Sequence, residues 1–270
     1  MKIFFTFILA INFFSVLAQE EKTEFKPSGK IWGYVFGDYF YKTDGDTVTS
    51  WGDGEFSKLK KETNAFTFRR AYLGYDFNIS EKFSTQFLLE GNDGITDKDG
   101  RRGVFIRLAY LEWRNLIPGA SIFIGQSATP TWATLTEKIW GYRSVEKMIT
   151  DFRKMGKSND LGIRISGEID SAGNFGYNLM VGNGTAEKPE ADIFKKRYGS
   201  LFLKLLNKKI TMEIYGDYEK ISDTKNKMTL KGFTAFESKN FTIGIEGVQQ
   251  YQTKYRGDTT NIIPMGFAFF

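Results

Sequence analysis

The residues of this sequence that could do chemistry are charged side chains placed where a solute could meet them. Arg70, Arg164 and Lys204 each belong to the polar half of a segment in which polar and apolar residues alternate. Such groups offer several hydrogen-bond donors to an oxyanion, so they predict a row of anion contacts. The alternative is that each cation pairs with a carboxylate on a neighbouring strand, and the abundance of carboxylates favours pairing for any single arginine. The carboxylates available are Asp76, Glu168, Glu213 and Glu246.

A second group of charges lies in the long segment 128–160, between two alternating segments. Residues 134–140 and 145–152 have helix-compatible composition, and a loop of this length with structure of its own is usually functional. Folded into the interior of a closed sheet, its charges would set a transverse field that selects solutes. A solvated external loop is the alternative. The candidates for such a constriction are Glu137, Arg143, Glu146, Lys147, Asp151, Arg153 and Lys154.

Composition excludes most covalent chemistry. The 270 residues include no Cys and no His, which rules out a disulfide framework, a thiolate metal site and a Ser-His-Asp hydrolase. We therefore expect no enzyme, no cofactor and no metal site. The run Asp97-Lys98-Asp99-Gly100 is a fragment of a calcium-loop pattern, but the remaining ligand spacing is absent, so a hydrated loop is expected. No stripe of basic and aromatic residues predicts nucleic-acid binding.

The N-terminus predicts export. Lys2 precedes an apolar run from Ile3 to Val16, and small residues lead to Ala18, which is the pattern of a secretory signal peptide spanning residues 1–18. Residues 19–29 form a polar leader that we expect in the periplasm. No later segment has the apolar length of a spanning helix.

From residue 30 onward the chain alternates with a period of two. In the segment 161–169, Ile163, Ile165 and Ile169 fall on one side, and Arg164 and Glu168 fall on the other. Only a strand separates two environments at this spacing. Similar segments predict about twelve strands, at 30–39, 66–77, 83–90, 104–114, 121–127, 161–169, 175–183, 198–206, 211–218, 228–237, 241–248 and 262–270.

The connections add a second pattern, because short and long links alternate along the whole series. The long links include Gly91–Gly103 and Glu219–Lys227. A transmembrane antiparallel up-and-down β-barrel over residues 30–270 explains this alternation through short periplasmic turns and longer external loops, and it places the chain in the bacterial outer membrane. A secreted antiparallel sandwich is the alternative. In the membrane, the cluster Lys195-Lys196-Arg197 would contact lipopolysaccharide phosphates.

Several short motifs resemble the phosphate-selective porin O and P family of Bacteroidetes-type bacteria. They are the stretches at 29–34 (GKIWGY), 68–74 (FRRAYLG), 125–130 (GQSATP), 160–164 (DLGIR) and 177–184 (YNLMVGNG). The resemblance implies a porin that passes small hydrophilic solutes, including phosphate-like anions, with the third loop folded inward. By analogy with porin folds we also expect a homotrimer. The rival hypothesis is a structural or adhesive barrel that acts through its external loops.

The same resemblance implies a barrel of sixteen strands or more, whereas this sequence provides about twelve. We therefore expect that the sequence is truncated after Phe270, with a complete twelve-stranded barrel as the alternative. Phe270 resembles the aromatic last residue of outer-membrane proteins. Pro264, Gly266 and Ala268, however, would give a closing strand only a thin apolar face, and Pro264 lacks the N–H of a fully paired strand.

Overall fold

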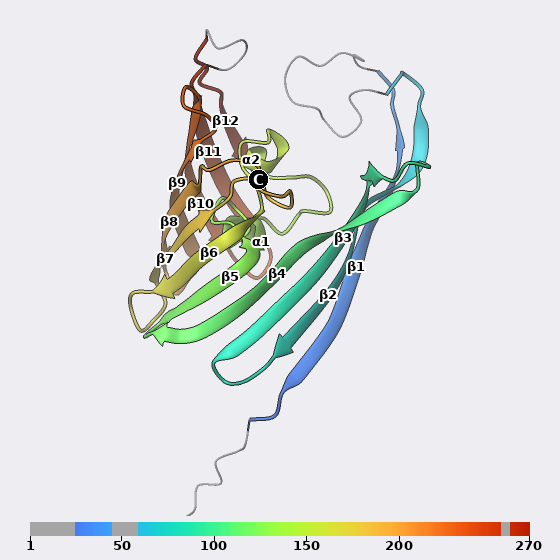
Figure 1. Ribbon diagram of the computed structural model, residues 1–270. Coiled ribbons are helices and arrows are strands. Elements are labelled where there is room, and N and C mark those ends of the chain that lie inside the picture. The colour runs from blue at the N-terminus through green and yellow to red at the C-terminus, as the bar shows by residue number, and fades with distance from the viewer. Residues whose placement is uncertain (1–24, 45–58, 255–259) are drawn as a thin grey trace, which may run out of the picture.

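The computed structural model describes residues 25–44, 59–254 and 260–270, so the predicted signal peptide and the first part of the leader lie outside the described residues. The dominant element is one antiparallel β-sheet of twelve strands, in which each strand pairs with the next in sequence (Figure 1). Every predicted segment corresponds to a strand of this up-and-down sheet. The strands are β1 (Ser28–Tyr41), β2 (Asn64–Asn78), β3 (Phe83–Thr96), β4 (Arg102–Ile117), β5 (Ala120–Ala128), β6 (Asn159–Glu168), β7 (Phe175–Gly182), β8 (Lys196–Leu205), β9 (Ile210–Lys220), β10 (Asn226–Glu237), β11 (Thr242–Gln252) and β12 (Met265–Phe269).

The sheet curves around the segment that joins β5 to β6 (Figure 1). This segment carries two short helices, α1 (Thr136–Trp140) and α2 (Ile149–Phe152). None of the helices in the described ranges has the length and apolar character needed to cross a membrane. All described strands belong to one sheet, which contradicts the two-layer sandwich. Its edges are β1 and β12, and the described residues of these two strands do not pair with each other.

The two faces of the sheet have the opposite polarity to those of a water-soluble protein. On β9, the inward-facing Thr211 and Glu213 are each 2% exposed, whereas the outward-facing Met212 and Ile214 are 43% and 65% exposed. The same alternation recurs on β7, β10 and β11. Apolar side chains therefore lie on the open face, and polar side chains lie on the covered face.

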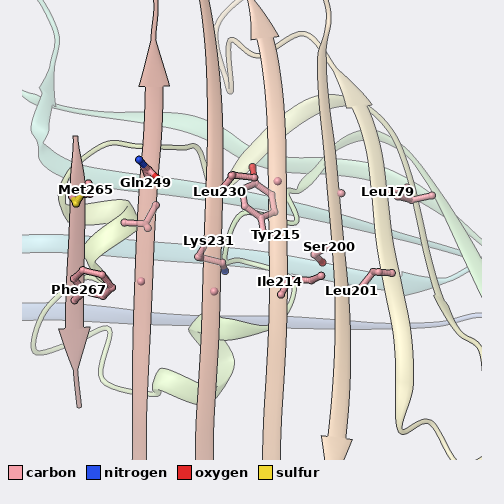
Figure 2. Close-up of a pocket in the computed structure, with 15 residues that line it drawn as sticks. Leu179, Ser200, Leu201, Ile214, Tyr215, Leu230, Lys231, Gln249, Met265 and Phe267 are labelled. Atoms are coloured by element: carbon pink, nitrogen blue, oxygen red, sulfur yellow. The ribbon is translucent and has the colours of Figure 1, made fainter. Parts of the chain in front are cut away.

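The outward face also contains an apolar groove of about 870 Å³ across β7–β12. Glycines form its floor, since Gly199 lies opposite Gly216 and Gly232 lies opposite Gly247. Figure 2 shows this groove, with Leu201, Ile214 and Phe267 among the side chains that line it. The outward face thus has shallow depressions at the glycines, bordered by large apolar side chains.

Two of the predicted long links are tight turns. The link expected at Gly91–Gly103 shortens to residues 97–101, because the β3–β4 hairpin continues to the pair Thr96 and Arg102. Within this turn, Asp97 Oδ1 accepts the backbone N–H groups of Asp99 and Arg101 at 2.9 and 2.8 Å. The link between β9 and β10 likewise shortens to 221–225. Residues 42–63, 129–158, 183–195 and 253–264 remain as the longer links at this end of the sheet.

Two β-bulges change which residues face inward. The pairing of β1 with β2 shifts after Phe36, which leaves Arg69 as an extra residue beside Arg70. The pairing of β3 with β4 shifts after Leu88, which leaves Arg107 as an extra residue in the same way. A bulge re-aims side chains locally, so strict alternation fails at these two positions.

The last strand presents a different face from the one expected. Met265, Phe267 and Phe269 are the exposed side chains of β12, at 62%, 67% and 77%. Gly266 instead faces inward, where an added Cβ would lie 2.6 Å from Ile149. The outward side of β12 is therefore fully apolar. The expectation of a thin apolar face was wrong because it assigned Pro264, Gly266 and Ala268 to the outward side.

The polarity of the sheet predicts different responses to the same substitution at two isoleucines. Ile214→Lys puts a charge on the outward face, which in lipid should cost about 2–4 kcal/mol near the bilayer centre. Ile193→Lys, at an 87% exposed position in the link 183–195, should change stability by less than about 0.5 kcal/mol. Urea unfolding in phospholipid vesicles measures both. Equal effects would mean that the outward face contacts water.

Candidate functional site: a charged loop inside the sheet

Residues 129–158, which we call the inner loop, lie against the inward face of the sheet (Figure 1). Hydroxyl groups attach it to β9 and β10. Thr131 Oγ1 is 2.9 Å from Tyr215 OH, and Lys231 Nζ donates to Thr136 Oγ1 at 3.2 Å. Both threonine side chains are fully buried. The inner loop is therefore packed against the sheet through buried groups, and its role as a constriction stays a prediction.

Further contacts extend this attachment to β11 and fill the space with apolar side chains. Thr150 donates to Glu246, and Gln250 Nε2 donates to the carbonyl oxygen of Met155 at 2.6 Å. Trp132 and Met148 from the inner loop pack with Phe233 and Ala235 from β10 in the buried apolar cluster. The wall formed by β9–β11 and the inner loop thus behave as one packed unit.

The buried charges on this wall are paired. Lys231 Nζ lies 2.8 Å from Glu213 Oε2, and both side chains are fully buried. Lys196 Nζ lies 3.1 Å from Asp217 Oδ2, which also accepts the hydroxyl of Tyr215 at 2.5 Å. These two buried lysines therefore each have a partner of opposite sign, as their desolvation requires, whereas the buried Glu246 is held by the hydroxyl of Thr150.

On the opposite wall, two arginines lie next to the same carboxylate. Arg70 Nε lies 3.9 Å from Glu90 Oε1, and Arg107 Nη1 lies 3.3 Å from Glu90 Oε2. Two guanidinium groups thus share one carboxylate. Arg107 also donates to the hydroxyl of Ser158 in the inner loop. Arg70 pairs with a carboxylate, as the alternative hypothesis expected, but with Glu90 rather than with one of the four carboxylates considered.

The inner loop also contacts β2. Arg143 forms an ion pair with Glu137 inside the loop, and its Nη2 donates to Tyr72 OH at 3.1 Å. Arg69 Nη1 donates to the carbonyl oxygen of Val145 at 2.9 Å. The loop therefore reaches both walls, and Arg70, Glu137 and Arg143 come together where it meets β2 and β3.

The other predicted loop charges lie elsewhere. Glu146 is exposed, and its carboxylate accepts the backbone N–H of Lys147 at 2.8 Å. Arg153 and Lys154 are exposed beside a cavity of about 630 Å³, which Lys227 and residues of β11 and β12 also line. The predicted charges therefore do not all meet at one place, since Arg153 and Lys154 lie beside β11 and β12 whereas Arg143 contacts Tyr72 of β2.

Arg164 and Lys204 belong to a separate basic cluster. Arg164 is 6% exposed, its Cζ lies 3.6 Å from the centroid of the Phe123 ring, and its Nη1 donates to Ser166 Oγ at 2.9 Å. Lys204 and Lys138 line a cavity of about 540 Å³ together with Ser166. No carboxylate of the described chain lies within 4.0 Å of the charged atoms of Arg164, Lys204 or Lys138, so cross-strand pairing fails for this cluster.

The environment of Lys138 reflects this crowding of like charges. Partial desolvation lowers the pKa of Lys138 below its ordinary value of 10.5, and the charges of Arg164 and Lys204 lower it further. All three effects favour the neutral amine. The cluster therefore carries electrostatic strain that a bound negative charge would relieve.

Sequence reasoning missed several of these residues. Arg69 and Arg107 are brought inward by bulges, which alternation does not reveal. Lys138 lies on α1, whose orientation depends on packing. The prediction that Lys195, Lys196 and Arg197 together contact lipopolysaccharide was wrong for Lys196. The Lys196 side chain is 3% exposed and pairs with Asp217, so the cluster does not present three charges to the outside.

Comparison with known proteins finds solved structures that align with this chain at low sequence identity. No family model and no curated protein matches the chain, so the resemblance to phosphate-selective porins stays a prediction. Among solved structures, the chain is similar to OmpF of Salmonella typhi in complex with daunomycin, with 12% identity, coverage of 90% of this chain and 86% of that one, and a TM-score of 0.47. It is also similar to the outer membrane channel DcaP of Acinetobacter baumannii, with 14% identity, 92% and 81% coverage, and a TM-score of 0.48. A third similar structure is OccK2 of Pseudomonas aeruginosa in complex with glucuronate. It has 7% identity and a TM-score of 0.48, and the alignment covers 90% of this chain and 60% of that one.

The buried pair of Lys231 and Glu213 predicts a large loss of stability when one partner is removed. Lys231→Met leaves Glu213 buried and unpaired, which should cost about 3–5 kcal/mol. The double variant K231M/E213L should recover part of this loss, because Glu213 is no longer left unpaired while the buried Glu246 keeps only its hydrogen bond from Thr150. Denaturant unfolding in detergent micelles measures both variants.

The matched control for this experiment is Lys220→Met. Lys220 pairs with Asp223 at 2.9 Å, but its side chain is 39% exposed and that of Asp223 is 88% exposed. Its loss should cost less than about 1 kcal/mol. A similar cost for both lysine variants would contradict the role assigned to the buried pair.

Proposed function

We propose that this chain forms the wall of a water-filled channel in the bacterial outer membrane, through which small hydrophilic solutes diffuse passively. The observation that carries the proposal is the inverted polarity of the sheet, with Met212 and Ile214 outward and Glu213 and Lys231 inward. Apolar side chains suit contact with lipid, and a polar interior suits contact with water and solutes. The similarity in fold to OmpF and DcaP agrees with this assignment.

The proposed organisation follows the sequence. Residues 1–18 are the signal peptide, 19–29 the periplasmic leader and 30–270 the barrel, in which the loop 128–160 narrows the passage. In a membrane the edges β1 and β12 require hydrogen-bonding partners, either in each other or in further strands. A homotrimer is the assembly expected by analogy with the fold. The external ends would contact outer-membrane lipid and lipopolysaccharide.

The proposed mechanism contains no covalent step and no cofactor. The 270 residues offer no His or Cys for nucleophilic or general-base catalysis. Selection instead follows from size at the inner loop and from charge on the wall. Because Arg70 and Arg107 share the single carboxylate of Glu90, this part of the wall has a net positive charge, which favours phosphate-like and other anions.

A second candidate function is a structural or adhesive barrel that acts through its external loops. The observation that favours it is the attachment of the inner loop to both walls, through Thr131 and Thr136 on one side and through Arg143 and Arg69 on the other. A loop fixed in this way could fill the lumen. Conduction separates the two functions, since a plugged barrel passes no ions.

The full-length protein reconstituted into planar lipid bilayers should produce discrete, ohmic conductance steps. Arg143→Ala should raise the step size, because it removes the hydrogen bond from the inner loop to Tyr72 and the ion pair with Glu137 within the loop. Ile193→Lys is a control that leaves the inner loop intact. Absence of steps from protein that is folded and inserted would contradict the channel and favour the adhesive barrel.

Charge selection can be tested without leaving a buried charge unpaired. The triple variant R70Q/E90Q/R107Q removes one net positive charge from the wall, and Lys98→Gln removes one positive charge from the exposed turn 97–101. The reversal potential in a KCl gradient should show anion preference in the wild type. The triple variant should lose this preference, whereas K98Q should keep it. Cation preference of the wild type would overturn the anionic part of the proposal.

A further inference from the structure

The cavity next to Lys138 and Lys204 lies at the end of the sheet that carries the short turns. Gly119 from the β4–β5 turn and Glu168 from the end of β6 contribute to its lining. The inner loop faces the cavity through Leu135, which precedes α1, and through Lys138 of α1. The cavity has a volume of about 540 Å³. It is therefore large enough for a small organic molecule, and a solute that passes the inner loop would reach it.

Within the described residues, no ion pair neutralises the three cations around this cavity, and Glu112 acts on Arg164 only from a longer distance. Lys138, Lys204 and Arg164 have no carboxylate within 4.0 Å, and the Nε of Arg164 is buried without a hydrogen-bond partner. The one carboxylate in the lining, Glu168, lies over the turn at Gly173, where an added Cβ would be 2.8 Å from either of its oxygens. By contrast, the buried lysines Lys196 and Lys231 are each paired with a carboxylate.

The cavity also offers an apolar surface and neutral hydrogen-bonding groups. Leu135 and Phe202 form apolar parts of its lining, and Lys204 Nζ lies 5.2 Å from the centroid of the Phe202 ring. Ser166 and Asn178 contribute polar groups. An anion with an apolar body would use both surfaces, whereas inorganic phosphate would leave the apolar one in contact with water.

We infer that this cavity is a binding site for a small organic carboxylate, held at its charged end by Lys138 and Lys204 and at its apolar end by Leu135 and Phe202. Arg164 contributes through the hydroxyl of Ser166, to which it donates. This inference rests on the proposed channel, in which the site would act as a stopping point on the passage. A carboxylate here relieves the repulsion among the three cations.

Benzoate is a suitable probe, and its binding to the full-length protein in detergent can be measured by titration calorimetry. Lys138→Gln and Lys204→Gln should each weaken benzoate binding about tenfold, because each removes a charge-assisted contact. Lys188→Gln, in the exposed link 183–195, is the matched control and should bind as the wild type does. Wild-type affinity in K138Q and K204Q would overturn the inference.

The chemical class of the ligand is tested by comparing benzoate with inorganic phosphate. Leu135→Ser should weaken benzoate binding and leave phosphate binding unchanged, since only benzoate contacts the apolar surface. Phosphate that binds as tightly as benzoate, or that loses affinity equally in L135S, would overturn the assignment to organic carboxylates. Raising the pH toward the pKa of Lys138 should weaken benzoate binding in the wild type more than in K138Q.

Conductance separates failure of this site from failure of the channel. Benzoate added to wild-type channels should reduce the chloride current in a concentration-dependent way, and K138Q and K204Q should require about tenfold more benzoate. A conducting channel that benzoate neither binds nor blocks would overturn the site and keep the channel. Benzoate binding that K138Q and K204Q weaken, in protein that does not conduct, would support the site and overturn the channel.

Discussion

The structure depends on one constraint: each strand must present polar side chains to one environment and apolar side chains to another while its backbone stays paired. On β9 this places Glu213 beside Lys231 on the inner side and Ile214 in the open on the outer side. A polar inner face cannot be covered by an ordinary apolar core. The inner loop covers it instead with hydroxyl and carbonyl groups, which hydrogen-bond to Tyr215, Lys231 and Gln250 of β9–β11.

The interior is electrostatically uneven, and this unevenness gives the fold its functional character. Against β9–β11 the buried lysines are paired, and hydrogen bonds from this side hold the loop in place. At β2–β4 two arginines share Glu90, and at the end with the short turns Lys138, Arg164 and Lys204 have no acidic partner in the described residues. Fixed cations in an interior of reduced dielectric attract anions over a longer range than the same cations in water.

Different residues of the inner loop contact the region with paired charges and the region with unpaired charges. Its threonines, together with Trp132 and Met148, attach it to β9–β11, where packing and hydrogen bonds act together. Its charged residues face the remaining space: Arg143 and Glu137 toward β2, and Lys138 toward β8. One segment therefore serves both as the filling of the interior and as the source of the charges that a solute would meet.

The sequence by itself determined the strands, their order and their two faces, because a period of two leaves no other way to separate Ile163 from Arg164 or Met212 from Glu213. It also indicated that the loop 128–160 folds inward. Only the tertiary structure decided which charges meet. Arg69 and Arg107 face inward through bulges that depend on the pairing of neighbouring strands, and Lys138 joins Arg164 and Lys204 only because α1 packs against the sheet. Local periodicity carries no information about register shifts or about how a loop docks, since both depend on contacts between residues far apart in the chain.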